Sequence, residues 1–184
     1  MNNAERILAE LDARLNTEVE LTLYGRAALS LGYPSPPPEF GQSMDVDCVL
    51  AVGQAEKLLE TTNFWQAIDE TNHALSEAGL YVSHLFVEDQ VILTEQWKEV
   101  RIPIKGPWRH LRLSRLGDQD LLLSKLMRDD PHDRSDALFI ALQAGMQIKT
   151  IKKLLKRAVV PESPELTEQF HMAADRLIEA LPNS

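Results

Sequence analysis

A proline-rich segment divides the N-terminal half of this chain and limits what that half can fold into. Four prolines fall within residues 34–38. Because proline fixes φ and has no backbone N–H, we expect an irregular loop from this segment to Gly41. Before the loop, residues 18–24 alternate apolar and polar side chains, which predicts a half-buried strand. After it, the apolar residues 44–52 predict a second strand inside a sheet.

The rest of the chain shows both helical and strand-like spacing of apolar residues. Helices are predicted over residues 3–16, 26–31, 53–79 with a break near 61–63, 117–157 in several pieces, and 164–181. Strands are predicted over residues 81–87, 90–93, 99–104 and 109–114. We therefore expect an α+β fold, with a mixed β-sheet, flanking helices and a helical C-terminal region. Its expected parts are an α+β core, residues 1–116, and a helical region, residues 117–184, packed on that core as one compact unit.

Composition limits the classes of protein that this chain can join. Its 184 residues are 44% hydrophobic and include one cysteine, which describes a globular chain without an internal disulfide. The apolar runs are far shorter than the roughly 20 residues of a membrane span, and the first residues lack the pattern of a signal peptide, so we expect a cytoplasmic protein with no membrane partner. The net charge of −9 disfavours broad, sequence-blind binding of nucleic acid over the whole surface, but it leaves room for a local basic patch or a divalent cation.

Two acidic residues interrupt the apolar strand predicted over residues 44–52. Because strand side chains alternate, Asp45 and Asp47 project from the same face, and their like charges repel unless a cation lies between them. A divalent metal or a pair of arginines would relieve that repulsion, and Mg²⁺ in particular takes one or two carboxylates together with water and phosphate. The alternative is a solvated strand end whose acids cap a loop.

A glycine turn precedes this strand in the sequence. The first strand ends at Tyr24-Gly25, and a short helix with small residues follows, so that a helix N-terminus able to attract phosphate lies near the acids. In these residues the chain resembles the nucleotidyltransferase superfamily, which has the polymerase-beta-like fold. In particular, it resembles small bacterial proteins of that superfamily related to AbiE-type abortive-infection toxins.

A second segment, residues 120–136, extends the resemblance, which covers about residues 18–145. It resembles a helical motif of the same relatives, and the matching positions are Asp120, Lys125, Arg128, Asp133 and Asp136. The resemblance implies transfer of a nucleoside monophosphate from an NTP, with Mg²⁺ or Mn²⁺ held by Asp45 and Asp47.

Further roles follow from the same resemblance. Gly25 is expected near the triphosphate, and Lys125 is expected to contact phosphate or the acceptor. The next residue is Arg26 where relatives have glycine or serine, so that its side chain either contacts the triphosphate or occupies its place. A two-metal transferase also uses a third carboxylate, for which Glu99 is the candidate. The alternative for Glu99 is a solvent-facing salt bridge with Arg101 on the same strand face.

Other functions remain open at this level. A protein with this fold can be a catalytically inactive binding or interaction module. A basic stretch, residues 149–157, is either a solvated helix face or a surface that binds RNA or an acidic partner. The acceptor is unknown and can be RNA, a protein or a small molecule, and the toxin resemblance implies an antitoxin-type protein partner. Asp130-Pro131 is best explained by structure rather than by function, because Asp as the N-cap and Pro as the next residue are typical of the start of a helix.

Overall fold

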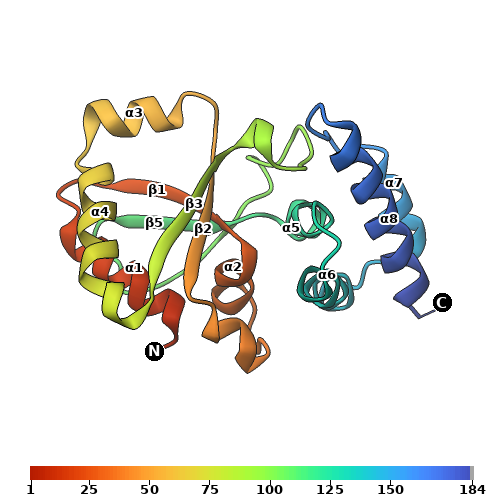
Figure 1. Ribbon diagram of the computed structural model, residues 1–184, viewed down its shortest axis with the longest axis horizontal. Helices are drawn as coiled ribbons and strands as arrows, with labels where there is room; N and C mark the ends of the chain where they lie inside the picture. Colours follow the sequence, from red (N-terminus) through yellow and green to blue (C-terminus); the bar gives the residue numbers. More distant parts are fainter. Residues whose placement is uncertain (183–184) are drawn as a thin grey trace. The chain divides into compact units, whose positions relative to one another are not determined.

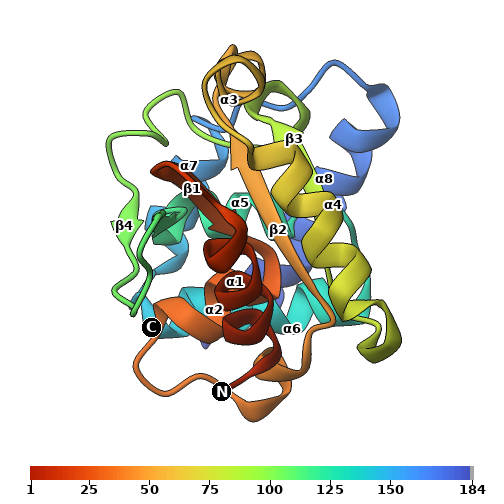
Figure 2. The ribbon, with the colours of Figure 1, turned by 90° about the vertical axis from the view of Figure 1, so that its left-hand side faces the viewer.

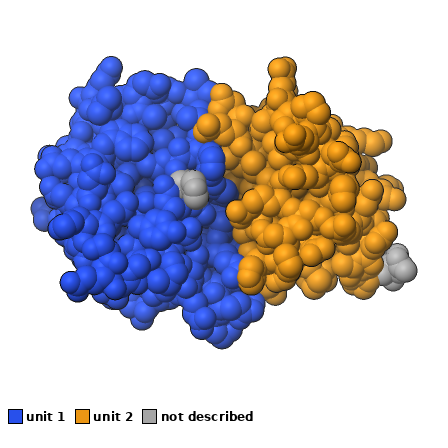
Figure 3. All heavy atoms as spheres, in the orientation of Figure 1, with its two compact units in different colours: residues 1–87, 101–115 blue, residues 88–100, 116–184 orange. Residues whose placement is uncertain are grey.

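The computed structural model describes residues 1–182, apart from the side chain of His84, and divides the chain into two compact units. Unit 1 consists of Met1–Val87 and Arg101–Arg115, and unit 2 consists of Glu88–Val100 and the chain from Leu116 onward (Figure 3). The chain therefore leaves unit 1 after Val87, returns at Arg101, and leaves it again after Arg115. None of the helices in the described part is long and apolar enough to cross a membrane.

Unit 1 is built on a mixed β-sheet. Its strands in the described residues are β1 (Val19–Tyr24), β2 (Asp45–Leu50), β3 (Tyr81–Val87), β4 (Ile102–Pro103) and β5 (Leu111–Arg115). They lie in the order β3-β2-β1-β5-β4, with β1 antiparallel to β2 and parallel to β5, β2 parallel to β3, and β4 antiparallel to β5. The expected α+β class with a mixed sheet and flanking helices is confirmed.

The central strand β1 forms because its apolar side chains recur with a period of two. Val19, Leu21 and Leu23 are buried, as the alternation predicted, and Thr22 is buried as well. Burial on both faces is expected for the middle strand of a five-stranded sheet that carries helices. The functional side chains discussed below lie where β1 ends and where its neighbour β2 begins.

Unit 1 also contains helices. They are α1 (Asn3–Arg14), α2 (Gly25–Gly32), α3 (Gln54–Thr61) and α4 (Phe64–Leu75), with the short 3-10 helices η1 (Pro38–Gln42) and η2 (Ser76–Ala78). Helix α1 begins at a capping box in which Asn2 and Glu5 each accept a hydrogen bond from the other's backbone N–H. Figure 2 shows α1 and α4 side by side in front of the sheet, and α2 packs against β1, β2 and η1.

Unit 2 is mainly helical. Its elements are η3 (Glu88–Gln90), α5 (Asp118–Lys125), α6 (Pro131–Gln143), α7 (Ile148–Leu155) and α8 (Pro164–Ala180), drawn from yellow-green to blue in Figure 1. The Asp130 side chain accepts hydrogen bonds from the backbone N–H groups of His132 and Asp133, and Pro131 occupies the first turn of α6. The prediction that Asp130-Pro131 begins a helix is confirmed.

Three local expectations from the sequence are wrong. The proline-rich segment is not wholly irregular, because Pro38 begins η1; proline is tolerated in a first turn, where its missing N–H would have had no partner. Residues 90–93 form an isolated bridge, Leu93 with Val159, rather than a strand, and their apolar side chains are buried within unit 2. The strand expected over residues 99–104 shrinks to β4, since residues 95–100 form turns and Pro103 cannot donate to a ladder.

Candidate functional site

Asp45 and Asp47 lie on β2 in unit 1 and share one face of the strand. Val46 and Cys48 between and after them are fully buried, whereas both aspartates are half-buried. This alternation follows from the period of two in a strand. The two carboxylates are therefore neighbours, and solvent reaches both.

A hydroxyl group from the adjacent strand joins the two carboxylates. Ser83 Oγ is hydrogen-bonded to Asp47 Oδ1 and lies 3.3 Å from Asp45 Oδ2, and Ser43 Oγ donates to Asp45 Oδ1 at 2.7 Å. A hydroxyl has one proton, so Ser83 donates a hydrogen bond to one aspartate at a time. The carboxylate of the other aspartate then lacks this hydrogen bond, and its negative charge is less stabilised. The three side chains thus form one cluster of oxygen atoms, which we call the β2 acid cluster: Asp45, Asp47 and Ser83.

A β-bulge brings Ser83 to this place. The parallel pairing of β2 with β3 joins Val46 to Val82 and Cys48 to Leu85, so β3 contributes one residue more than β2 between these pairs. Bulges re-aim side chains and are common next to active sites. The sequence pattern does not predict Ser83 at this site, because Ser83 is 36 positions away from Asp47 and only the pairing of the strands joins them.

Gly25 lies against the carboxylate of Asp47. The antiparallel pairing of β1 with β2 places Tyr24 opposite Asp47, and the chain then turns at Gly25 with a φ of +69° to begin α2. A Cβ atom at Gly25 would lie 2.7 Å from Asp47 Oδ2, so any other residue here would force the Asp47 carboxylate to move. The N-cap residue Tyr24 does not cap α2 with its side chain, so the first turn of this helix faces the cluster without such a cap.

Arg26 contacts η1, the 3-10 helix that begins at the last residue of the proline-rich segment. Its guanidinium lies 5.6 Å from the centre of the Phe40 ring, in cation-π geometry, and Phe40 is buried in η1. The one cationic side chain in the first turn of α2 thus contacts η1. Whether Arg26 contacts a triphosphate stays a prediction.

Glu99 does not lie on a strand. It is exposed within the turns of residues 95–100 in unit 2, and the expectation that it shares a strand face with Arg101 is wrong. Arg101 instead belongs to unit 1, where its guanidinium lies 2.6 Å from Glu20 on β1. The role of Glu99 as a third carboxylate remains a prediction.

Lys125 takes part in a buried network of ion pairs in unit 2. Its ammonium nitrogen lies 3.0 Å from Asp133 Oδ1 and 2.8 Å from Asp136 Oδ2, and Arg128 Nε lies 3.0 Å from Asp133 Oδ2. Lys125, Asp133 and Asp136 are all buried, which removes these charges from water. The motif of residues 120–136 therefore forms a buried ion-pair network here, and the contact of Lys125 with phosphate or acceptor stays a prediction.

The β2 acid cluster has donor atoms suited to a hard divalent ion. All its donors are oxygens, and two carboxylates are the number that Mg²⁺ commonly takes from a protein while it keeps water and phosphate as its other ligands. In the described residues, no group of three or more His, Cys, Asp or Glu side chains is placed to hold a metal. Burial, and then the charge of Asp47, raise the pKa of the Cys48 thiol, so Cys48 is not a thiolate ligand.

The fold and the cluster together define a class of protein. A mixed sheet that brings a glycine turn at a helix N-terminus beside two strand-borne aspartates is typical of the nucleotidyltransferase superfamily. The sequence model of one family, described as "Nucleotidyltransferase of unknown function (DUF6036)", matches residues 4–176, and the chain belongs to this family. No curated protein and no solved structure matches the chain.

Proposed function

We propose that this protein transfers a nucleoside monophosphate from an NTP to a hydroxyl group of an acceptor, in a reaction that depends on Mg²⁺ or Mn²⁺. One observation carries the proposal: Asp45 and Asp47 project from the same face of β2, share the hydroxyl of Ser83, and lie beside the turn at Gly25. Membership of a nucleotidyltransferase family supports the same reaction class.

The aspartates have the role of metal ligands in this proposal. Asp45 and Asp47 would hold Mg²⁺ or Mn²⁺ through carboxylate oxygens, and Ser83 would keep the two side chains aligned. When bound there, the ion supplies positive charge that offsets the negative charge developing on the phosphate oxygens. Without a cation, the two carboxylates repel one another, so the cluster is best suited to a protein that binds one.

The backbone at the start of α2 has the role of a phosphate cradle. Gly25 has no side chain, so the triphosphate can approach the N–H groups of the first helical turn closely. The positive end of the helix dipole favours the anion at the same place. The Arg26 guanidinium lies 5.6 Å from the centre of the Phe40 ring. If it moved away from that ring, its positive charge would attract the triphosphate.

The reaction is an in-line displacement at the α-phosphorus. The acceptor oxygen forms a bond to the α-phosphorus, the bond from that phosphorus to the bridging oxygen of the β-phosphate breaks, and pyrophosphate leaves. The proton of the acceptor hydroxyl is released to water. In this scheme Glu99 would be the third carboxylate and Lys125 a phosphate or acceptor contact, as the family resemblance implies.

The direct test is a label-transfer assay. The protein is incubated with each α-labelled NTP, Mg²⁺ or Mn²⁺, and a cell extract that supplies acceptors. We expect wild-type protein to label an acceptor, and we expect Asp45→Asn and Asp47→Asn to lower labelling at least about 100-fold. Ser83→Ala should lower it about 10- to 100-fold, the usual effect of losing a group that supports a metal ligand.

Asp69→Asn is the matched control, because Asp69 is an exposed aspartate on α4 of the same unit. It should label acceptors as wild type does. Equal labelling by wild type and the Asp45→Asn variant, or no labelling with any NTP, would contradict the proposed activity and leave a binding module of the same fold. The identity of the labelled species would report whether the acceptor is RNA, a protein or a small molecule.

The resemblance to AbiE-type toxins leads to a finer proposal. It implies that a bacterial cell producing this protein also produces an antitoxin-type partner. Arrested growth on expression of wild type, and normal growth with Asp45→Asn, would support it. Normal growth with both would contradict a toxin role without affecting the transfer activity.

A further inference from the structure

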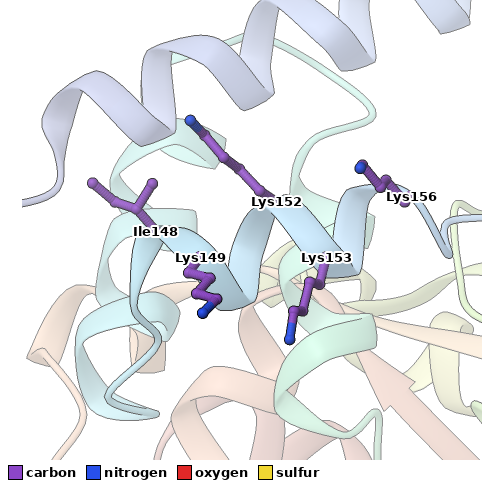
Figure 4. Close-up of a pocket in the computed structure, with 5 residues that line it drawn as sticks. All are labelled: Ile148, Lys149, Lys152, Lys153 and Lys156. Atoms are coloured by element: carbon purple, nitrogen blue, oxygen red, sulfur yellow. The ribbon is translucent and has the colours of Figure 1, made fainter.

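Helix α7 in unit 2 presents four lysines on one side. Lys149, Lys152, Lys153 and Lys156 are exposed and, together with Ile148, line a hollow of about 320 Å³. Figure 4 shows Lys152 and Lys156 projecting in one row and Lys149 and Lys153 in a second row. Members of each row are four residues apart, which is about 6 Å along a helix. We call these four residues the α7 lysine face.

None of the four ammonium groups forms an ion pair or hydrogen bond with another group in the described part of the chain. Other lysines of unit 2 do form ion pairs: Lys125 pairs with Asp133, and Lys98 pairs with Glu88. Like charges three and four residues apart on a helix repel, by a few tenths of a kcal/mol for each pair. In a chain with a net charge of −9, this surface is a local concentration of positive charge that attracts anions.

The other side of α7 limits the kind of anion. Ile151 and Leu154 are buried, so the apolar side of the helix is already covered by the protein. A helix that lies on a membrane needs an exposed apolar side to insert, which α7 lacks. The hollow also contains no aromatic or arginine anchor of the kind that dominates protein–protein interfaces.

We propose that the α7 lysine face binds the phosphate backbone of a nucleic acid. Two rows of flexible ammonium groups match an anion that repeats along a strand, and they contact charge rather than base edges, so the binding is independent of sequence. Nucleic acid strands of both kinds carry this backbone. The inference rests on α7 alone and does not depend on the proposed transfer reaction.

The test measures how binding depends on salt. Fluorescence anisotropy is recorded with the full chain and 16-nucleotide oligo(U) RNA or oligo(dT) DNA, between 50 and 200 mM NaCl. Four lysines that each neutralise one phosphate of a single strand predict a slope of log K against log salt of about −2.8, which is a loss of about 50-fold over this range. Binding of both probes identifies the backbone as the ligand, and binding of RNA alone identifies RNA as its source.

Substitutions then assign the binding to α7. Lys152→Gln/Lys156→Gln should halve the slope, so that the loss over the same salt range is about 7-fold. Glutamine and lysine have similar helix propensities, and both positions are exposed, so we expect the variant to keep the fold. Lys152→Arg/Lys156→Arg keeps the charge and should keep the wild-type slope.

The control removes the same charge from unit 1, where Lys57 and Lys105 are also exposed. Lys57→Gln/Lys105→Gln should bind as wild type does. No binding of either probe at 50 mM NaCl would overturn the proposal. A wild-type slope in the Lys152→Gln/Lys156→Gln variant, or equal binding of poly-glutamate in place of the oligonucleotides, would also overturn it.

Discussion

Gly25 and Asp47 lie so close together that a Cβ atom on the glycine would be 2.7 Å from Oδ2 of the aspartate. Gly25 also has a φ of +69°, in the left-handed region that other L-residues rarely adopt. The backbone angle thus favours glycine at the junction of β1 and α2, and a larger residue there would also displace the Asp47 carboxylate. The consequence for function is that backbone, rather than a side chain, faces the β2 acid cluster.

Replacing this glycine should destabilise the fold more than replacing a comparable glycine elsewhere. Gly25→Ala combines left-handed strain with a clash against Asp47, and we expect it to lower the free energy of unfolding by about 2–3 kcal/mol. Gly53→Ala is the matched control, since Gly53 has a φ of +79° but nothing within 4 Å of its Cβ position. It should cost about 1 kcal/mol, from strain alone. Urea unfolding measures both, and equal losses would contradict the close approach.

The buried ion pairs of Lys125 should be essential to unit 2. Lys125→Met removes the Lys125 cation from buried Asp136 and leaves Asp133 with Arg128 alone, and we expect a loss of about 3–5 kcal/mol in the free energy of unfolding. The control is Arg112→Met, which removes an exposed pair with Glu18 and should cost less than about 1 kcal/mol. Thermal or urea unfolding of the full chain measures the difference. A loss near 1 kcal/mol for Lys125→Met would mean that water screens the network.

Asp12 should make the fold less stable in acid. Burial acts to raise its pKa, but hydrogen bonds from the backbone N–H groups of Arg109, His110 and Leu111 hold the pKa below the ordinary value of 3.8. The charged form is therefore favoured in the folded state. Its stabilisation is present above the unfolded pKa and is lost as pH falls through the folded pKa.

We expect Asp12→Ala to lower the free energy of unfolding by about 3 kcal/mol at pH 7, because three backbone donors lose a charged acceptor. The difference in the free energy of unfolding between wild type and Asp12→Ala should become smaller as the pH falls below about 4. Unfolding curves at several pH values test this, with Asp69→Ala as an exposed control that should change stability by less than about 0.5 kcal/mol. A difference in the free energy of unfolding that stays constant with pH would show that Asp12 stabilises the fold without its charge.

Asp120 should have the opposite dependence on pH. It is completely buried, and burial raises its pKa above the ordinary 3.8 although the backbone N–H of Thr94 donates to Oδ1 at 2.6 Å. Among the described residues, its Oδ2 has no hydrogen-bond partner. The neutral form is favoured in the folded state, so the contribution to stability is present below the unfolded pKa and is lost as pH rises through the folded pKa.

Asp120→Asn keeps the acceptor for Thr94 and cannot ionise. The difference in unfolding free energy between variant and wild type should therefore move in favour of the variant as the pH rises from about 3.5 to 7. The same set of pH-dependent unfolding curves measures it. A shift in favour of wild type over that range would contradict the raised pKa.

Local patterns account for what the sequence predicted well. The strand over β1 and the helices α1, α4 and α8 follow from apolar spacing, which is a property of neighbouring residues. The shared face of Asp45 and Asp47 follows from the period of two in β2. A short apolar run fits a strand and a buried segment without regular structure equally well, and residues 90–93, of which Val91, Ile92 and Leu93 are buried, were predicted as a strand for that reason.

The sequence by itself thus determined the class of fold, the glycine turn and the pair of acids on one strand, because each depends on residues that are close in the chain. Only the tertiary structure decided that Ser83 joins those acids and that Lys125 pairs with Asp133 and Asp136. The physical reason is that a bulged strand pairing and the packing of helices select contacts between distant residues. Such contacts are chosen by the free energy of the whole unit, which no local pattern in the chain records.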